Sequence, residues 1–116
     1  MTDQATFRLR EFNGVPVIEV TGELDIANID DFRAFVRDAT LADGVSVIVS
    51  FERVSYFDSH ALEALVEFSK RLHTNRRQLR IVARRESPAG RLLRTSNLDL
   101  ALRLFETVDE ARLASM

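Results

Sequence analysis

The chain has 116 residues, of which 46% are hydrophobic and 29% are charged. This composition excludes disordered and fibrous proteins and suits one globular domain over residues 1–116. The chain contains no cysteine, which excludes disulfides, thiol nucleophiles and cysteine-ligated metals. The first residues lack the apolar core of a signal peptide, and no apolar run approaches the ~20 residues of a membrane span. We therefore expect a cytoplasmic protein without membrane insertion.

The first two predicted elements form a hairpin. Apolar and basic side chains alternate from Thr6 to Phe12, as in a strand with one covered face, and Asn13-Gly14 is a strong hairpin-turn signal. A β-branched run from Val15 to Thr21 supplies the second strand. Gly22 is expected to end that strand.

The next predicted element is an amphipathic helix. Apolar residues recur on one face between Ile29 and Ala39, and charged residues occupy the other faces. Asp25 or Asn28 is expected to cap this helix, since either side chain can accept a hydrogen bond from a free amide of the first turn. The helix is predicted to cover a sheet.

A central strand and a second helix follow. The short β-branched run from Val45 to Phe51 predicts a strand that is buried on both faces. Residues 53–57 are interpreted as a turn that leads into a helix over residues 59–74, whose apolar positions have helical spacing. Asn75 is expected to end this helix in a left-handed conformation.

The last part of the chain continues the alternation. Its pattern predicts a strand from Leu79 to Ala83, a helix from Ser87-Pro88 to Asn97, a short strand within residues 102–105, and a terminal helix from Thr107 through Ala114. Strands that alternate with helices after an initial hairpin predict an α/β domain, in which right-handed crossovers place helices against a small mixed sheet.

Ser59 has two interpretations at the start of the helix over residues 59–74. A serine at this position is a common N-cap, which would give it only a structural role. Asp58 can take the cap instead, which would leave Ser59 at the first helical position with its hydroxyl exposed. Residues at the carboxyl ends of strands in α/β sheets are the usual functional positions, and Ser59 is predicted to lie at one of them.

These residues resemble the STAS domains of bacterial anti-sigma factor antagonists. The family pattern of a strand, a loop and Asp-Ser-Ser/Ala-Gly-Leu at a helix start corresponds to residues 58–62. Gly22-Glu23-Leu24-Asp25 is similar to the family's Gly-x-Leu-Asp, and Ser96-Asn97-Leu98 lies near its helix-ending Gly-Leu. The chain differs from the family pattern at three positions. His60 stands where a small residue is usual, Ala61 where glycine is usual, and Ser50 where the central strand usually ends in aspartate.

The resemblance implies a small mixed sheet with helices mainly on one side, and a regulatory role. It implies an anti-sigma factor antagonist that binds an anti-sigma factor serine kinase and is switched off when this kinase phosphorylates Ser59. A serine phosphatase would reverse the modification. The expected partner-binding residues are Asp25, Tyr56, Asp58, Ser59, His60, Ala61 and Leu62. At the second helical position, the His60 ring is expected to be largely exposed beside Ser59.

A second hypothesis keeps the same surface but removes the switch. In that case the protein would be a STAS adaptor or scaffold subunit of a signalling or transporter complex, and Ser59 would not be phosphorylated. The histidine beside the serine favours this alternative if its ring hinders a kinase.

An enzyme is not expected, although Ser59, His60 and His73 are residue types found in hydrolases. Neighbours on a helix point about 100° apart, and His73 lies about 21 Å further along the same helix. Neither a metal nor another cofactor is expected, because the sequence has two histidines and no HExxH motif, aspartate-rich loop or glycine-rich phosphate loop.

The charge is unevenly distributed although the net charge is only -2. Residues 70–94 carry nine Lys or Arg residues and one acid, whereas residues 1–69 carry a large acidic excess. A basic segment can bind nucleic acid, but the acidic part would repel phosphates and no aromatic residue lies between Lys70 and Arg94 for base stacking. We therefore expect no direct nucleic-acid binding and interpret the segment as a solvated face, with an acidic partner as the alternative.

Overall fold

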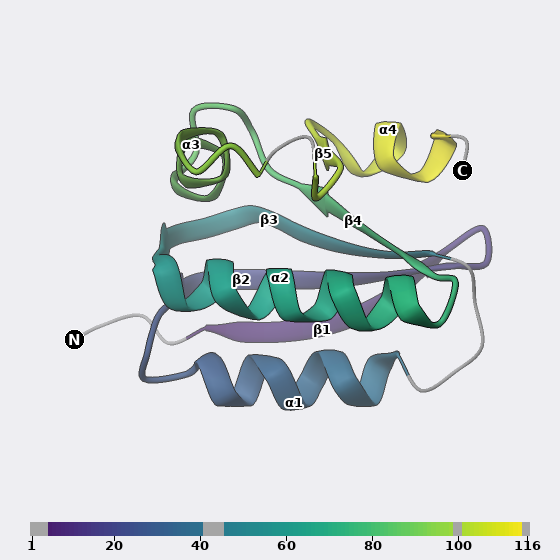
Figure 1. Ribbon diagram of the computed structural model, residues 1–116, viewed down its shortest axis with the longest axis horizontal. Coiled ribbons are helices and arrows are strands. Elements are labelled where there is room, and N and C mark those ends of the chain that lie inside the picture. The colour runs from purple at the N-terminus through teal and green to yellow at the C-terminus, as the bar shows by residue number, and fades with distance from the viewer. Residues whose placement is uncertain (1–4, 41–45, 99–100, 115–116) are drawn as a thin grey trace.

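The computed structural model describes residues 5–40, 46–98 and 101–114. Five strands form one mixed sheet in the order β1-β2-β3-β4-β5, with β1 and β2 antiparallel and the other neighbours parallel (Figure 1). The strands are β1 (Thr6–Phe12), β2 (Val15–Leu24), β3 (Ser46–Phe57), β4 (Gln78–Val82) and β5 (Leu104–Phe105). The helices are α1 (Ile29–Ala39), α2 (Ser59–Thr74), α3 (Pro88–Thr95) and α4 (Val108–Leu113). The predicted fold class is confirmed.

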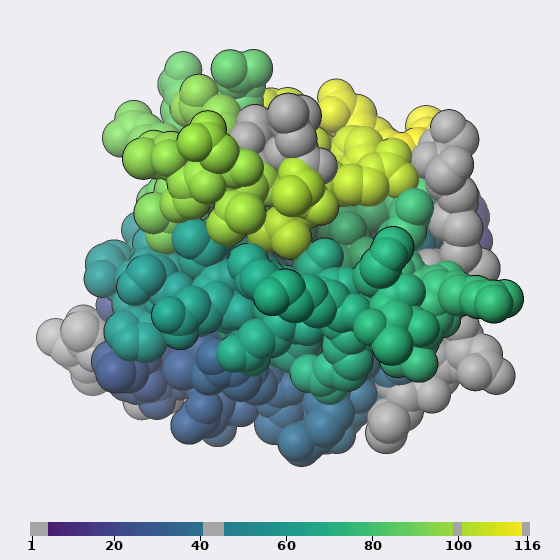
Figure 2. Space-filling model, viewed as in Figure 1, coloured from purple at the N-terminus to yellow at the C-terminus, as the bar shows by residue number. Residues whose placement is uncertain are grey.

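The main core lies between the sheet and α1, α2 and α3. Aromatic rings from four elements meet there, and Phe32 of α1 lies 5.7 Å from both Phe7 of β1 and Phe68 of α2, measured between ring centroids. In Figure 2, α1 and α2 form the outer layer of the molecule on this side. Phe7 lies on the edge strand β1, where its ring packs against Phe32 and Phe35 of α1.

A smaller core lies on the opposite face of the sheet, where α4 covers it. The buried residues of this core are Val17, Ile48, Val82 and Ala111. Arg80 of β4 faces the same side at only 2% exposure, and its Nη1 donates a hydrogen bond of 2.7 Å to the Ala111 carbonyl. Three helices on one face and one short helix on the other agree with the expectation of helices mainly on one side.

The course of β2 and β3 corrects two sequence interpretations. Gly22 does not end β2, which continues to Leu24, and residues 53–57 are not a turn but the second half of β3. The β2 to β3 register shifts twice in this region, and Gly22 has a φ of 100° that a glycine tolerates. Buried residues then recur every third position, at Phe51, Val54 and Phe57, so the alternation that identifies a regular strand is lost.

Helix ends follow local capping chemistry, with small differences from the predictions. Ser87 caps α3 by accepting a hydrogen bond from the Gly90 amide, and Thr107 caps α4 by accepting one from the Glu110 amide, as predicted. The Glu110 carboxylate reaches the Glu106 amide instead of the Thr107 amide that a capping box would use. Asn75 has a φ of -96°, and Arg76, at 58°, is the left-handed residue after α2.

The other boundaries differ from the predictions by a few residues. β4 begins and ends one residue before the predicted strand, and β5 is limited to residues 104–105, with Leu102 buried outside it. α3 ends at Thr95, two residues before the predicted end at Asn97, which lies in the left-handed region with a φ of 58°. The predicted strand start at Val45 lies outside the described residues.

Candidate functional site

The start of α2 exposes a serine hydroxyl that has no structural role. Asp58 is the N-cap, and its Oδ1 accepts hydrogen bonds from the amides of His60 at 3.0 Å and Ala61 at 3.3 Å. Ser59 is therefore the first helical residue, and within the described chain its exposed hydroxyl forms no hydrogen bond. Of the two sequence interpretations, the structure supports capping by Asp58 and leaves Ser59 available for modification.

The loop after β2 lies beside this helix start. Leu24 pairs with Phe57 at the carboxyl ends of β2 and β3, so Asp25 and Asp58 follow the two strands at the same edge of the sheet. Asp25 accepts a hydrogen bond from the Ala27 amide, and its own amide donates to the side chain of Asn28. Asp25 therefore shapes the loop through one oxygen of its half-buried carboxylate.

The side chain of the α1 N-cap residue does not form the hydrogen bond that the sequence analysis expects. Asn28 occupies the cap position, but its side chain makes no capping bond to α1. Its amide nitrogen instead donates to the Glu23 carbonyl at 2.7 Å. The Asn28 side chain thus links the loop to β2 and holds residues 25–27 at the edge of the sheet where α2 begins.

Two large apolar side chains are exposed in the segments that meet at this edge of the sheet. Tyr56 is 46% exposed near the end of β3, and Ile26 is 68% exposed in the loop after β2. The sequence analysis included Tyr56 but missed Ile26, whose only signal is an isolated large apolar residue in a polar turn. Exposed apolar residues around a free hydroxyl are typical of a protein-binding surface.

His60 is turned toward the cap. Its side chain is 43% exposed, and Nδ1 lies 3.5 Å from Oδ2 of Asp58. This nitrogen is covered and forms no hydrogen bond within the described chain. The ring is therefore less exposed than expected, and the edge that carries Nδ1 is directed to Asp58 instead of to solvent.

The remaining expected contact residues differ in accessibility. Leu62 is half-buried one turn after Ser59, so part of its side chain is available. Ala61 is fully buried in the main core, where a small side chain allows α2 to pack on the sheet. Its side chain cannot reach a partner in this conformation.

Ser50 is not at the end of the central strand. β3 continues for seven residues beyond it, and Ser50 lies at 4% exposure on the face of the sheet opposite α2. Its hydroxyl donates to the Glu52 carboxylate at 3.1 Å. This departure from the family pattern therefore lies away from the start of α2.

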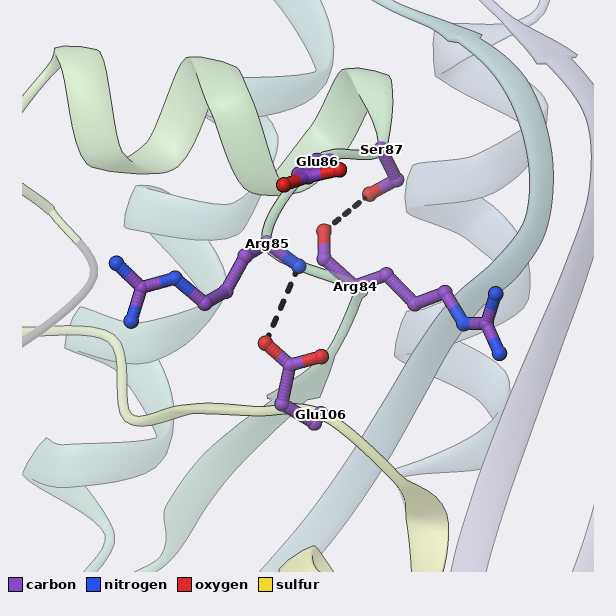
Figure 3. A pocket seen from close by; sticks show the side chains of 5 residues that line it. All are labelled: Arg84, Arg85, Glu86, Ser87 and Glu106. Atoms are coloured by element: carbon purple, nitrogen blue, oxygen red, sulfur yellow. Dashed lines mark hydrogen bonds between the residues drawn. The ribbon is translucent and has the colours of Figure 1, made fainter.

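A cavity of about 590 Å³ lies apart from Ser59, beyond the ends of β4 and β5. Figure 3 shows that the Arg84 and Arg85 side chains point away from each other there. The Ser87 hydroxyl donates to the Arg84 carbonyl at 2.7 Å and accepts from the Gly90 amide, and Glu106 accepts from the Arg85 amide. These polar groups hold the loop before α3, and they do not form a nucleophile with an adjacent base.

Within residues 5–40, 46–98 and 101–114, no three His, Asp or Glu side chains are grouped as metal ligands. No helix in the described part of the chain is long and apolar enough to cross a membrane. His73 is exposed near the opposite end of α2 from Ser59, as the helical spacing predicts.

Comparison with known proteins identifies the fold. A family model described as the STAS domain matches residues 6–111, and a search of curated protein sequences found no significant match. An anti-sigma factor antagonist from Mycobacterium paratuberculosis is 21% identical with a TM-score of 0.85, over 94% of this chain and 92% of that one.

Two further solved proteins have the same fold. The Bacillus cell fate determinant SpoIIAA in its phosphorylated form is 24% identical with a TM-score of 0.68, over 92% of this chain and 96% of that one. A sulfate transporter family protein from Wolinella succinogenes is 24% identical with a TM-score of 0.70, over 85% of this chain and 82% of that one.

Proposed function

Since the protein belongs to the STAS domain family, we propose that it is an anti-sigma factor antagonist that is switched by phosphorylation of Ser59. Unmodified, it binds an anti-sigma factor that is also a serine kinase, and so releases a sigma factor. Phosphorylated on Ser59, it dissociates until a serine phosphatase removes the phosphate. It acts through protein contacts and not as an enzyme, and this function implies the cytoplasm.

The observation that carries this proposal is the free hydroxyl at the start of α2. Asp58 satisfies the first amides of α2, so the Ser59 hydroxyl can change chemically without loss of a cap. Tyr56 near the end of β3 and Ile26 in the loop after β2 are exposed apolar residues at the same edge of the sheet, where a partner can cover them. The phosphorylated form of a protein with the same fold, SpoIIAA, is consistent with the proposal.

Phosphate would act on the interface more than on the fold. It adds about -1.5 to -2 charges. The N-terminus of α2 stabilises that charge by about 0.3 to 1 kcal/mol, and Glu63, one turn further, opposes it by a few tenths. Burial of the same charge against a partner surface that fits a neutral hydroxyl costs several kcal/mol, which corresponds to a loss of affinity of roughly a hundredfold or more.

Mass spectrometry of the intact protein tests the modification. Each candidate anti-sigma serine kinase from the same genome is incubated with ATP and the wild-type chain or the Ser59→Ala variant. We expect one phosphate on the wild type and none on the variant. Phosphate on Ser87 or Ser96 in place of Ser59 would show that the site is wrong.

Calorimetric titration tests the switch. The Ser59→Asp variant should bind the kinase at least tenfold more weakly than the wild type, because a carboxylate carries part of the charge of a phosphate. Its free energy of unfolding should stay within about 1 kcal/mol of the wild-type value, since a helix N-terminus accepts an acid. Equal affinity of both forms would rule out the charge switch.

The effect of His60 on the switch can be measured separately. The ring lies beside the proposed phosphate position and is directed toward Asp58. If it hinders the kinase, His60→Ser should raise the rate of Ser59 phosphorylation, and if it contacts the phosphate, the variant should be dephosphorylated faster. Unchanged rates of both reactions would mean that His60 has no part in the switch.

A STAS adaptor without phosphorylation is the second candidate. The fold of a sulfate transporter family protein supports it, as does the partial cover of the helix start by His60. It predicts that a partner binds the same surface while every kinase leaves Ser59 unmodified.

A further inference from the structure

The outer side of α2 carries an apolar groove that extends beyond the expected partner-binding residues and shares only Leu62 with them. Leu62 and Val66 of α2 line it together with Leu98, which follows α3, and its volume is about 380 Å³. All three apolar side chains are only partly buried. Figure 2 shows α2 running across this side of the molecule below the residues that follow α3.

The rim of the groove is acidic. Glu63 and Glu67 line it one helical turn apart, a spacing at which two carboxylates repel each other. Arg33 of α1 neutralises Glu67, with distances of 3.2 Å and 3.4 Å to its two carboxylate oxygens. Glu63 is exposed and has no ion-pair partner within the described residues, so its carboxylate can pair with a cation from outside.

The groove is continuous with the surface around Ser59. Leu62 lies one turn after Ser59, and Val66 lies about two turns, or roughly 10 Å, along the helix axis. A partner that covers Ser59 can therefore extend over the groove without contact with Lys70, which lies a further turn along α2. Val66 carries no charge and lies about two turns from Ser59, so its contact can be varied independently of a charge on Ser59, whereas Glu63 is only one turn from Ser59.

We propose that this groove is a second docking site for the anti-sigma factor kinase and that it takes an amphipathic segment of the kinase with Arg or Lys beside its apolar residues. The inference rests on the proposed function for the identity of the partner. The apolar side chains of the segment contact Leu62, Val66 and Leu98, and its cation pairs with Glu63. This contact contributes to affinity in both states of Ser59, so the phosphorylated protein still binds the kinase, with lower affinity than the unmodified protein.

A peptide probe tests the chemistry of the groove without the kinase. The probe is a helical peptide of about 18 residues with Leu at i and i+4 positions and Arg beside them, and a matched peptide carries Glu in place of Arg. With the full chain, the Arg peptide should shift the methyl NMR signals of Leu62, Val66 and Leu98, and the Glu peptide should bind more weakly. Equal binding of both peptides, or shifts elsewhere, would overturn the proposal.

Variants assign the contact to the groove. Glu63→Lys should weaken the Arg peptide by roughly fivefold, the effect of a reversed rim charge, and Val66→Ala should weaken it by removal of apolar area. Glu11→Lys is the matched control, because it makes the same charge change on exposed β1, beside the hairpin turn and away from α2. Thermal unfolding of each variant shows whether the fold is retained.

Titration with the kinase separates this proposal from the Ser59 switch. Val66→Ala should raise the Kd by the same factor in the wild-type and Ser59→Asp backgrounds, whereas Glu63→Lys, one turn from residue 59, is compared in the wild-type background alone. Groove variants without effect would reject the groove and leave the switch intact. Weaker binding by the groove variants with no effect of Ser59→Asp would reject the switch alone. If sedimentation shows a dimer of this chain and Val66→Ala dissociates it, the groove binds a second copy of the chain and the proposal is overturned.

Discussion

At the residue scale, Asp58 and Ser59 have separate positions at the start of α2, where Asp58 caps the helix and the Ser59 hydroxyl is left exposed. Asp58 accepts both amide bonds, so Asp58→Ala should lower the free energy of unfolding by about 1 kcal/mol, the usual effect of a lost cap. Ser59→Ala should change it by less than about 0.5 kcal/mol, since this surface hydroxyl has no partner in the described structure. Urea denaturation measures both values. A larger loss for Ser59→Ala than for Asp58→Ala would contradict this assignment.

At the element scale, α4 depends on its contacts with the sheet. A helix of six residues has little stability of its own, and Arg80 attaches it by the hydrogen bond to Ala111. Burial, and then the nearby charge of Arg103, lower the pKa of Arg80. The guanidinium therefore remains costly to bury, although it satisfies a carbonyl near the end of α4.

Replacement of Arg80 should release α4 before the rest of the fold. Arg80→Ala leaves a cavity and an unsatisfied carbonyl, and should destabilise the protein by about 2 to 4 kcal/mol. Arg80→Met fills most of the volume without a buried charge and should cost less. Hydrogen exchange should accelerate in α4 more than in α2 in both variants. Uniform acceleration in the two helices would mean that Arg80 does not act through α4.

At the scale of the whole molecule, β3 joins the two cores. Val47 and Val49 face the main core, whereas Ile48 faces the core under α4. Ile48→Ala should therefore lower the stability of the entire domain, by about 2 to 5 kcal/mol, in one cooperative transition. Calorimetry should give equal calorimetric and van't Hoff enthalpies for wild type and variant. Two separate transitions would show that the core under α4 unfolds independently.

The sequence alone predicted the turns and helix starts whose backbone conformation depends on residues a few positions apart. Asn13-Gly14 predicts the hairpin because these residues tolerate a positive φ. Asp58, Ser87 and Thr107 predict helix starts because each side chain bonds an amide two or three residues away. The alternation of strands and helices then limits the possible topologies to a few, and the motif at residues 58–62 carries the family resemblance.

Only the tertiary structure decided the features that depend on distant pairing. The path of β3 through residues 52–57 is set by its irregular pairing with β2. Buried residues recur there at every third position, a spacing that does not identify a strand in the sequence. The same pairing places the loop that carries Ile26 at the edge of the sheet where α2 begins, and packing in the core removes Ala61 from the surface. The burial of Arg80 and the groove between α2 and Leu98 likewise need contacts between residues more than thirty positions apart. The sequence by itself determined that a serine follows the cap of α2, because capping depends on neighbouring residues, and the packing of the chain decided which residues are exposed around that helix start.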